Sequence, residues 1–133
     1  MKDFTELNLR LQNLTAGLDG ELWRRLLTEA DPPRQLPPEQ EVLDMVFRDA
    51  KAISGYVPDL MVIMRRYNPS DLDAANRQAL AGLLGLFQLV ARLLLLVLLV
   101  PRYREHEDLI TNFNAYRQTL ALVEDYLAQA GRR

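Results

Sequence analysis

His106 is the only histidine of the chain, and it lies in the charged run Arg104-Glu105-His106-Glu107-Asp108. A histidine beside carboxylates could bind a metal ion or move a proton in acid–base catalysis. Residues adjacent in a helix point in different directions, however, so these side chains cannot all converge on one ion. The run also lies where a helix is expected to begin. We therefore interpret His106 as part of a solvated helix end.

Other residues that could do chemistry are few. The chain contains no cysteine, which excludes disulfides and every cysteine-ligated metal site. The glycine-rich phosphate loops and the histidine–glutamate metal signatures are absent. Carboxylate pairs such as Asp71/Asp73 sit where helix ends are expected. The sequence therefore predicts no catalytic residue, no metal site and no cofactor, and an enzyme is the least favoured class.

Arginine occurs in pairs that could contact phosphate groups if the fold gathered them on one face. The candidates are Arg24, Arg25, Arg65, Arg66, Arg102 and Arg104. Each pair also has a simpler role, because cations are favoured near helix C-termini. The formal net charge is −2, whereas a general nucleic-acid binder carries a basic excess. Nucleic acid is thus an unfavoured partner.

The composition predicts a helical protein. Hydrophobic residues make up 49 % and charged residues 26 % of 133 residues, which is typical of one globular domain over 1–133. Good helix formers dominate, and runs of alternating β-branched and polar residues are absent. With no secretory signal, we expect a cytoplasmic protein, with a membrane location as the alternative.

The chain divides at a proline-rich connection over 31–38, because proline is incompatible with a helix interior. Before it, residues 1–30 form an N-terminal helical arm; after it, 39–133 form the main bundle. The arm carries an apolar seam with spacings of three and four. Its candidate interface residues are Phe4, Leu7, Leu11 and Leu14. The main bundle opens with helices over 39–54 and from Pro58 onward.

The central helix, at about 70–100, is the most informative element. Ser70 is expected to cap it. Between Leu80 and Val100 only Gln88 and Arg92 interrupt the apolar residues, so this stretch is a transmembrane candidate by length. A polar-and-small stripe with helical spacing argues instead for a buried helix with one wet face. The stripe is Asp71, Ala75, Gln78, Gly82, Gly85, Gln88 and Arg92.

Residues 93–100 are apolar on every side of this helix. Such a segment must be enclosed by neighbouring helices, by a second subunit or by lipid. Arg92 precedes the segment, and we expect its long side chain to reach the surface, because an unpaired buried guanidinium is costly.

The last helix is expected over about 103–130, with apolar residues alternating four and three apart. This heptad pattern is typical of helix–helix packing. Its candidate interface residues are Leu109, Phe113, Tyr116, Leu120, Val123 and Leu127.

The sequence thus predicts an all-α protein, a four- to five-helix bundle, mostly antiparallel, around a long hydrophobic central helix at about 70–100. Because it holds more apolar seams than a minimal bundle needs, we expect a protein-interaction or assembly module. Its partner would be another protein or a second copy, most simply in a dimer. The alternatives are a membrane-associated protein spanning at about 80–100 and an accessory subunit of a nucleoprotein complex.

Overall fold

The computed structural model describes residues 2–17 and 40–131, which form five α-helices and two 3₁₀ turns without a strand. The helices are α1 (Phe4–Gly17), α3 (Gln40–Ser54), α4 (Val57–Arg66), α5 (Ala74–Leu98) and α6 (Glu107–Ala130). The 3₁₀ turns are Pro69–Asp71 and Pro101–Tyr103. The predicted all-α class is confirmed. The expected connection over 31–38 lies outside the described residues.

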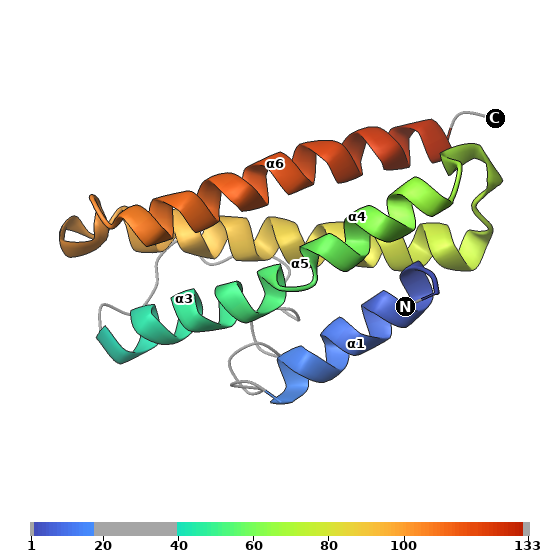
Figure 1. The fold of residues 1–133 in the computed structure, drawn as a ribbon. Helices are drawn as coiled ribbons and strands as arrows, with labels where there is room; N and C mark the ends of the chain where they lie inside the picture. The colour runs from blue at the N-terminus through green and yellow to red at the C-terminus, as the bar shows by residue number, and fades with distance from the viewer. Residues whose placement is uncertain (1, 18–39, 132–133) are drawn as a thin grey trace.

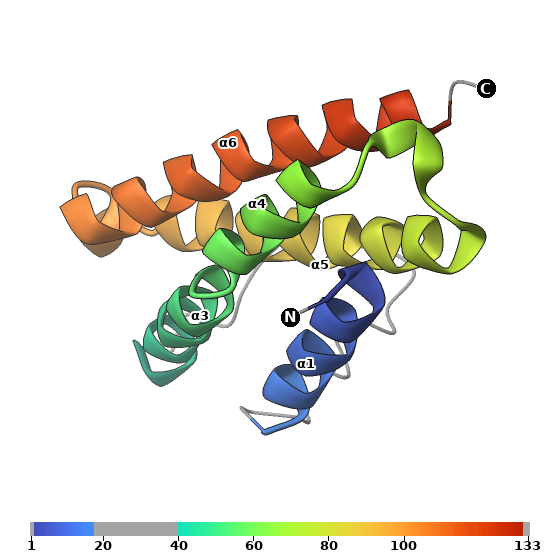
Figure 2. The same cartoon turned by 45° about the vertical axis from the view of Figure 1, so that its right-hand side comes forward.

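The helices pack around α5, which spans the length of the molecule (Figure 1). α6 runs antiparallel along it, and α1 and α3 also contact it. Figure 2 shows α1 and α3 crossing α5 obliquely, whereas α6 stays alongside. α4 packs against α1. The prediction of a bundle around a long central helix is confirmed, with α5 and α6 as its antiparallel pair.

The start of α5 differs from the prediction. Asp73 caps the helix, because its Oδ1 accepts a hydrogen bond from the backbone N–H of Asn76 at 2.8 Å. Hydrogen bonds from the backbone and side chain of Asn76 lower the pKa of Asp73. The predicted cap at Ser70 is wrong: Ser70 lies in the turn Pro69–Asp71, where its own backbone N–H donates to the side chain of Asn68.

The start of α6 is also later than predicted. Pro101 opens a 3₁₀ turn that ends at Tyr103. His106 then caps α6, with Nδ1 accepting a hydrogen bond from the backbone N–H of Leu109 at 3.2 Å. The interpretation of His106 as an exposed helix end therefore agrees with the structure.

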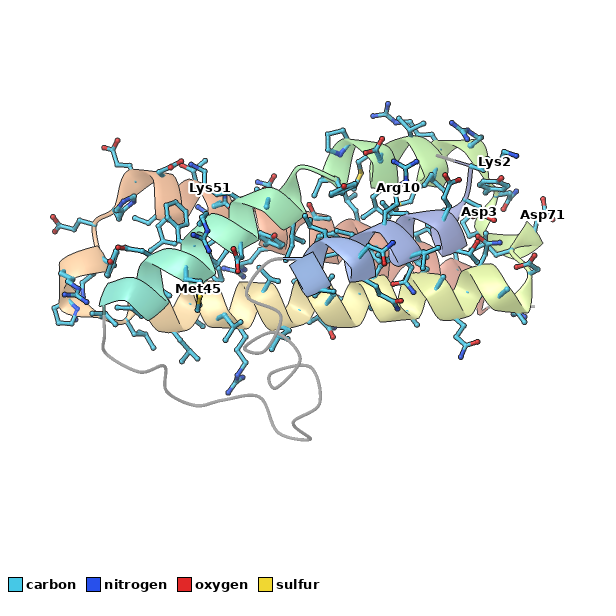
Figure 3. All side chains as sticks on the ribbon, turned by 90° about the horizontal axis from the view of Figure 1, so that it is seen from below. Lys2, Asp3, Arg10, Met45, Lys51 and Asp71 are labelled. Atoms are coloured by element: carbon cyan, nitrogen blue, oxygen red, sulfur yellow. The ribbon has the colours of Figure 1, made fainter. Side chains whose placement is uncertain are left out.

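The start of α1 is tied to α5 and α6 and, through Tyr126, to the residue that follows α4. The backbone N–H of Phe4 donates to Oδ1 of Asn76 in α5 at 3.0 Å. The Phe4 ring meets the ring of Tyr126 in α6 edge-on, with centroids 5.8 Å apart. The hydroxyl of Tyr126 donates to the carbonyl of Tyr67, directly after α4, at 2.8 Å. Figure 3 shows Lys2, Asp3 and Asp71 together at this end of the bundle.

Tyrosine side chains also tie α3 to the last two elements. The Tyr116 hydroxyl of α6 donates to the Ala50 carbonyl at 2.5 Å, and burial raises the pKa of Tyr116. The Tyr103 hydroxyl donates to Oδ1 of Asp44 at 2.6 Å, a hydrogen bond that raises the pKa of Tyr103. An exposed ion pair joins Lys51 to Asp108 at 2.7 Å. These contacts fix α3 against α6.

The inward face of α5 forms the centre of the core. Its fully buried side chains are Leu80, Leu83, Phe87, Val90, Leu93, Leu94 and Val97. Phe87 packs against Tyr116 of α6, with ring centroids 5.7 Å apart. The seam predicted on α1 faces the same core: Phe4, Leu7 and Leu11 are fully buried and Leu14 is half-buried. The described part of the N-terminal arm therefore packs into the bundle.

Candidate interaction face

The heptad seam predicted on α6 is divided by the fold. Leu109, Tyr116 and Val123, seven residues apart, are buried, whereas the alternating positions Phe113, Leu120 and Leu127 are only half-buried. Thr119 and Tyr126 are buried in their place. The physical reason is that α6 must contact α3 and the turn Pro69–Asp71 as well as α5. Its inward side is therefore turned away from the predicted seam, and the half-buried positions lie along one edge.

The described arginine pairs do not gather on one face. Arg65 and Arg66 lie in the last turn of α4, near the end of the bundle where α5 begins (Figure 1). Arg102 lies within the turn Pro101–Tyr103 and Arg104 directly follows it, at the opposite end, where α5 stops. Arg24 and Arg25 lie outside the described residues. The described pairs therefore cannot grip one phosphate backbone as a single patch.

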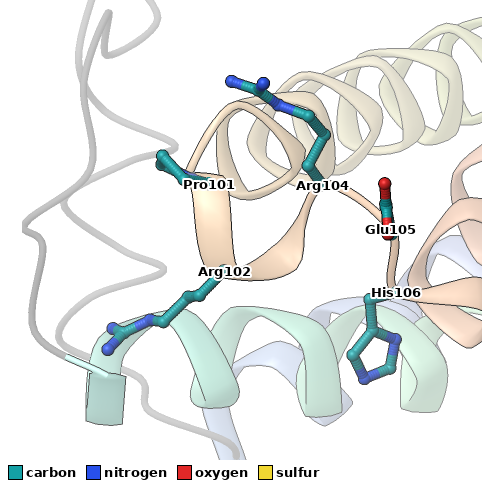
Figure 4. Close-up of a pocket in the computed structure, with 5 residues that line it drawn as sticks. All are labelled: Pro101, Arg102, Arg104, Glu105 and His106. Atoms are coloured by element: carbon teal, nitrogen blue, oxygen red, sulfur yellow. The ribbon is translucent and has the colours of Figure 1, made fainter.

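Arg102 and Arg104 line an open pocket of about 520 Å³ with Pro101, Glu105 and His106. Figure 4 shows the two arginine side chains leaving the turn in different directions, with Glu105 on the α6 side. The Arg102 guanidinium lies 5.4 Å from the centroid of the Tyr103 ring. His106 is held in the pocket wall by its capping hydrogen bond. This arrangement does not focus charge on one point, so we do not assign the pocket a ligand.

The outer side of α5 carries one exposed stripe along the whole helix. Its residues alternate four and three apart, as in a coiled-coil seam. They are Ala74, Gln78, Ala81, Gly85, Gln88, Arg92, Leu95 and Leu99, and each is exposed. We call this set the α5 stripe. The polar-and-small residues predicted to share the wet side, from Asp71 to Arg92, are all exposed as well, and the side chain of Arg92 reaches the surface as expected.

Two other helices border the α5 stripe. On one edge, α1 approaches closely: a methyl group at Gly82 would come within 3.7 Å of the Asn8 side chain. On the other edge, Gln88 Nε2 lies 3.5 Å from Glu124 Oε1 of α6. Between these edges, a methyl group at Gly85 would meet no atom within 4 Å. The described helices therefore leave the middle of the stripe open.

The two halves of the α5 stripe differ in size and polarity. From Ala74 to Gly85 the exposed residues are small or polar, whereas the C-terminal part ends in two leucines. Leu95 is 43 % exposed and Leu99 is 64 % exposed. These leucines belong to the segment 93–100 that the sequence required to be enclosed. Leu93, Leu94 and Val97 have no exposed area, whereas the other described helices leave Leu95 and Leu99 exposed.

Other large apolar side chains of the described helices are also exposed. Leu9 of α1, Val62 of α4 and Leu122 of α6 lie on separate helices. Single exposed leucines and valines are common on soluble proteins and need no partner. Leu95 and Leu99 differ because they continue a regular helical seam, one member of which, Gln88, contacts Glu124 of α6.

The prediction of a polar stripe stopped at Arg92 and so missed its two most apolar members. Extending the same spacing by three and then four residues reaches Leu95 and Leu99, which is the signal that would have found them. Polarity alone could not distinguish them from their neighbours, because every residue from 93 to 100 is apolar. Which of these residues face outward depends on how α1, α3 and α6 pack.

α5 is also long and apolar enough to cross a membrane. In the bundle, 44 % of its most apolar stretch is buried.

Within 2–17 and 40–131, no three histidine, aspartate or glutamate side chains gather in a way that could hold a metal ion. Comparisons with family models, with curated proteins and with solved structures find no match to this chain.

Proposed function

We propose that the protein is a non-enzymatic helical module that assembles with protein through the α5 stripe and the adjoining edge of α6. It would do so by self-association or as a small subunit of a larger complex, in the cytoplasm. The observation that carries this proposal is the exposure of Leu95 and Leu99 on an otherwise regular seam.

The cost of leaving this surface in water supports the proposal. Burying a leucine side chain contributes roughly 1.5–3 kcal/mol relative to full exposure. Seven apolar side chains of α5 lie in the core at 0 % exposure, so the other helices already cover its inner side. The exposed leucines, Leu95 and Leu99, lie on the α5 stripe. A second protein surface would complete the enclosure that residues 93–100 require.

The surroundings of the stripe also suit a protein partner. Interfaces combine an apolar centre with a polar rim. Leu95, Leu99 and the half-buried Phe113 supply apolar area. Arg92, Arg117 and Glu124 supply exposed charge around it, with the Arg117 guanidinium 5.9 Å from the centroid of the Phe113 ring.

Light scattering during size-exclusion chromatography tests this function on the full chain purified without detergent. We expect a mass of a dimer or a higher oligomer at micromolar concentration. A monomer at every concentration that binds no hydrophobic dye would contradict the proposal, because the stripe would then need no partner.

A membrane-associated protein spanning at about 80–100 is the second candidate, and the length and hydropathy of α5 favour it. We rank it lower because a span would have to exchange the packing of Phe87, Val90 and Leu94 against other helices for lipid. It would also carry Arg92 into the bilayer, at a cost of about 2.5–3.5 kcal/mol on insertion scales. Recovery of the protein only in the presence of detergent would reverse this ranking.

A further inference from the structure

We propose that the partner of the α5 stripe is the same stripe of a second copy, packed antiparallel about a two-fold axis between Gly85 and Gln88. This inference rests on the proposed function and adds to it the identity and the orientation of the partner. Three properties of the stripe support it: its spacing, its gradient of side-chain size and the charges at its ends.

The spacing of the stripe gives a complete antiparallel register. In antiparallel coiled coils each layer joins two different heptad positions, one from each helix. With the axis between Gly85 and Gln88, every residue of the stripe meets a partner of the other heptad position. The layers are Ala74 with Leu99, Gln78 with Leu95, Ala81 with Arg92, and Gly85 with Gln88.

The gradient of size makes these layers complementary. In three of the four layers an alanine or glycine of the N-terminal half meets a longer side chain of the C-terminal half, and in the fourth layer Gln78 meets Leu95. Leu99, the most exposed of the stripe's leucines at 64 %, would lie over Ala74. Gly85 faces open space, which gives room for the Gln88 side chain of the other copy. A two-fold interface must be self-complementary in this way.

Charges at the two ends of α5 favour the same orientation. Asp71 precedes the helix and Arg102 follows it, and both are exposed. Antiparallel packing would bring the end of one copy that carries Asp71 towards the end of the other copy that carries Arg102. The dipoles of the two α5 helices would also be antiparallel, so that each helix N-terminus lies beside a C-terminus of opposite partial charge.

A parallel pairing would lose these advantages. It would place Arg92 against Arg92, and like charges in direct contact are destabilising. It would also stack Gly85 on Gly85, leaving a gap in the middle of the stripe. The stripe therefore distinguishes the two orientations.

Cysteine cross-linking tests the orientation, because the chain has no native cysteine. The full-length variants Ala74→Cys and Leu99→Cys are oxidised separately and as a mixture, with one of them carrying a tag that changes its mass. A disulfide needs Cα atoms within about 7 Å. In the antiparallel pair, positions 74 and 99 of the two copies face each other, whereas two copies of position 74 lie roughly 37 Å apart along the helix axis.

We expect cross-linked dimers in the mixture and none from either variant alone. Cross-linking of each variant with itself would overturn the antiparallel register. Absence of any cross-link, while light scattering on the same samples finds a dimer, would also overturn it but leave the proposed function standing. Monomers in light scattering would overturn the two-fold pairing, and monomers that also bind no hydrophobic dye would contradict the proposed function.

Gly85→Leu is a second test that does not depend on oxidation. A leucine at this position meets open space within one copy, so the variant should fold as well as the natural chain. In the dimer the leucine would crowd Gln88 of the other copy and weaken association by roughly tenfold or more, as overpacking does. Ala121→Leu, on the exposed side of α6, is the matched control and should associate normally. Normal association of Gly85→Leu would overturn the register.

Discussion

The inner and outer sides of α5 both carry leucines towards the C-terminal end of the helix, but these leucines are in different environments. On the inner side, Leu83, Phe87 and Leu94 have no exposed area, whereas on the outer side Leu95 and Leu99 are 43 % and 64 % exposed. Polar contacts follow the same division. The inner side of the bundle is tied by the buried hydrogen bond from Tyr116 to Ala50 at 2.5 Å. The outer side has one exposed contact between Gln88 and Glu124 at 3.5 Å.

This difference teaches that hydrophobicity alone does not assign a side chain to the core. The inner side stabilises the fold of one chain, so changes there should alter the free energy of unfolding. The outer side is available for association, so changes there should alter the oligomeric state and leave the fold intact. Four predictions test this separation.

The largest expected effect is on the inner side. Phe87→Ala should lower the free energy of unfolding by about 3–5 kcal/mol, because it removes a fully buried aromatic ring and leaves a cavity. The matched outer variant Leu99→Ala should change the stability of dilute protein by less than about 0.5 kcal/mol. Urea denaturation at low protein concentration measures both. Equal losses would mean that the two sides are not distinct.

The buried hydrogen bond comes next. Tyr116→Phe should cost about 1–3 kcal/mol, because it leaves the Ala50 carbonyl without its donor. The outer control Gln88→Ala should be close to neutral in dilute solution. Burial raises the pKa of Tyr116, so its contribution is present below the unfolded value of about 10 and is lost as the pH rises above it. Alkaline denaturation should therefore be less steep in Tyr116→Phe, and an unchanged profile would argue against this bond.

A smaller effect of opposite sign is expected in the middle of the outer side. Gly85→Ala should stabilise the monomer by roughly 0.5–1 kcal/mol, because alanine has the higher helix propensity and the added methyl group meets no atom within 4 Å. Thermal unfolding of dilute protein measures the gain. A loss of stability would mean that another part of the chain packs over Gly85.

The smallest effect concerns the cap of α5. Hydrogen bonds from Asn76 lower the pKa of Asp73, so the cap stabilises the fold above the unfolded value of about 4 and loses this effect as the pH falls through the folded value. Asp73→Asn keeps a capping acceptor without the charge. Its stability should therefore depend less on pH between about 4 and 2 than that of the natural chain, as followed by circular dichroism. Identical pH profiles would contradict this role.

Much of the fold could be predicted from the sequence because it follows from periodicity. The 3.6-residue pattern placed Phe4, Leu7 and Leu11 in the core and the small residues of α5 outside it. The starts of α5 and α6 could not be placed as well. Ser70 and Asp73 both have capping side chains, and only the 3₁₀ turn at Pro69 decides between them.

The candidate interaction face was harder to predict, because it depends on contacts between helices. The heptad pattern fits Phe113, Leu120 and Leu127 as well as it fits Tyr116. Because α6 contacts α3 and the turn Pro69–Asp71 as well as α5, these three residues lie at the edge of its buried side. In residues 93–100 every position is apolar, so polarity does not mark the outer side there. The spacing of the stripe points to Leu95 and Leu99, and the packed structure shows that they are exposed.

The mass of the double variant Leu95→Asp/Leu99→Asp in solution, beside that of the natural chain, tests the central claim most directly. We expect the natural chain at about twice 15.3 kDa and the variant at the mass of one chain, with the same helical circular dichroism and an unfolding transition that remains cooperative. A variant that stays dimeric, or a natural chain that is monomeric at every concentration, would contradict the claim that the outer side of α5 is built for association.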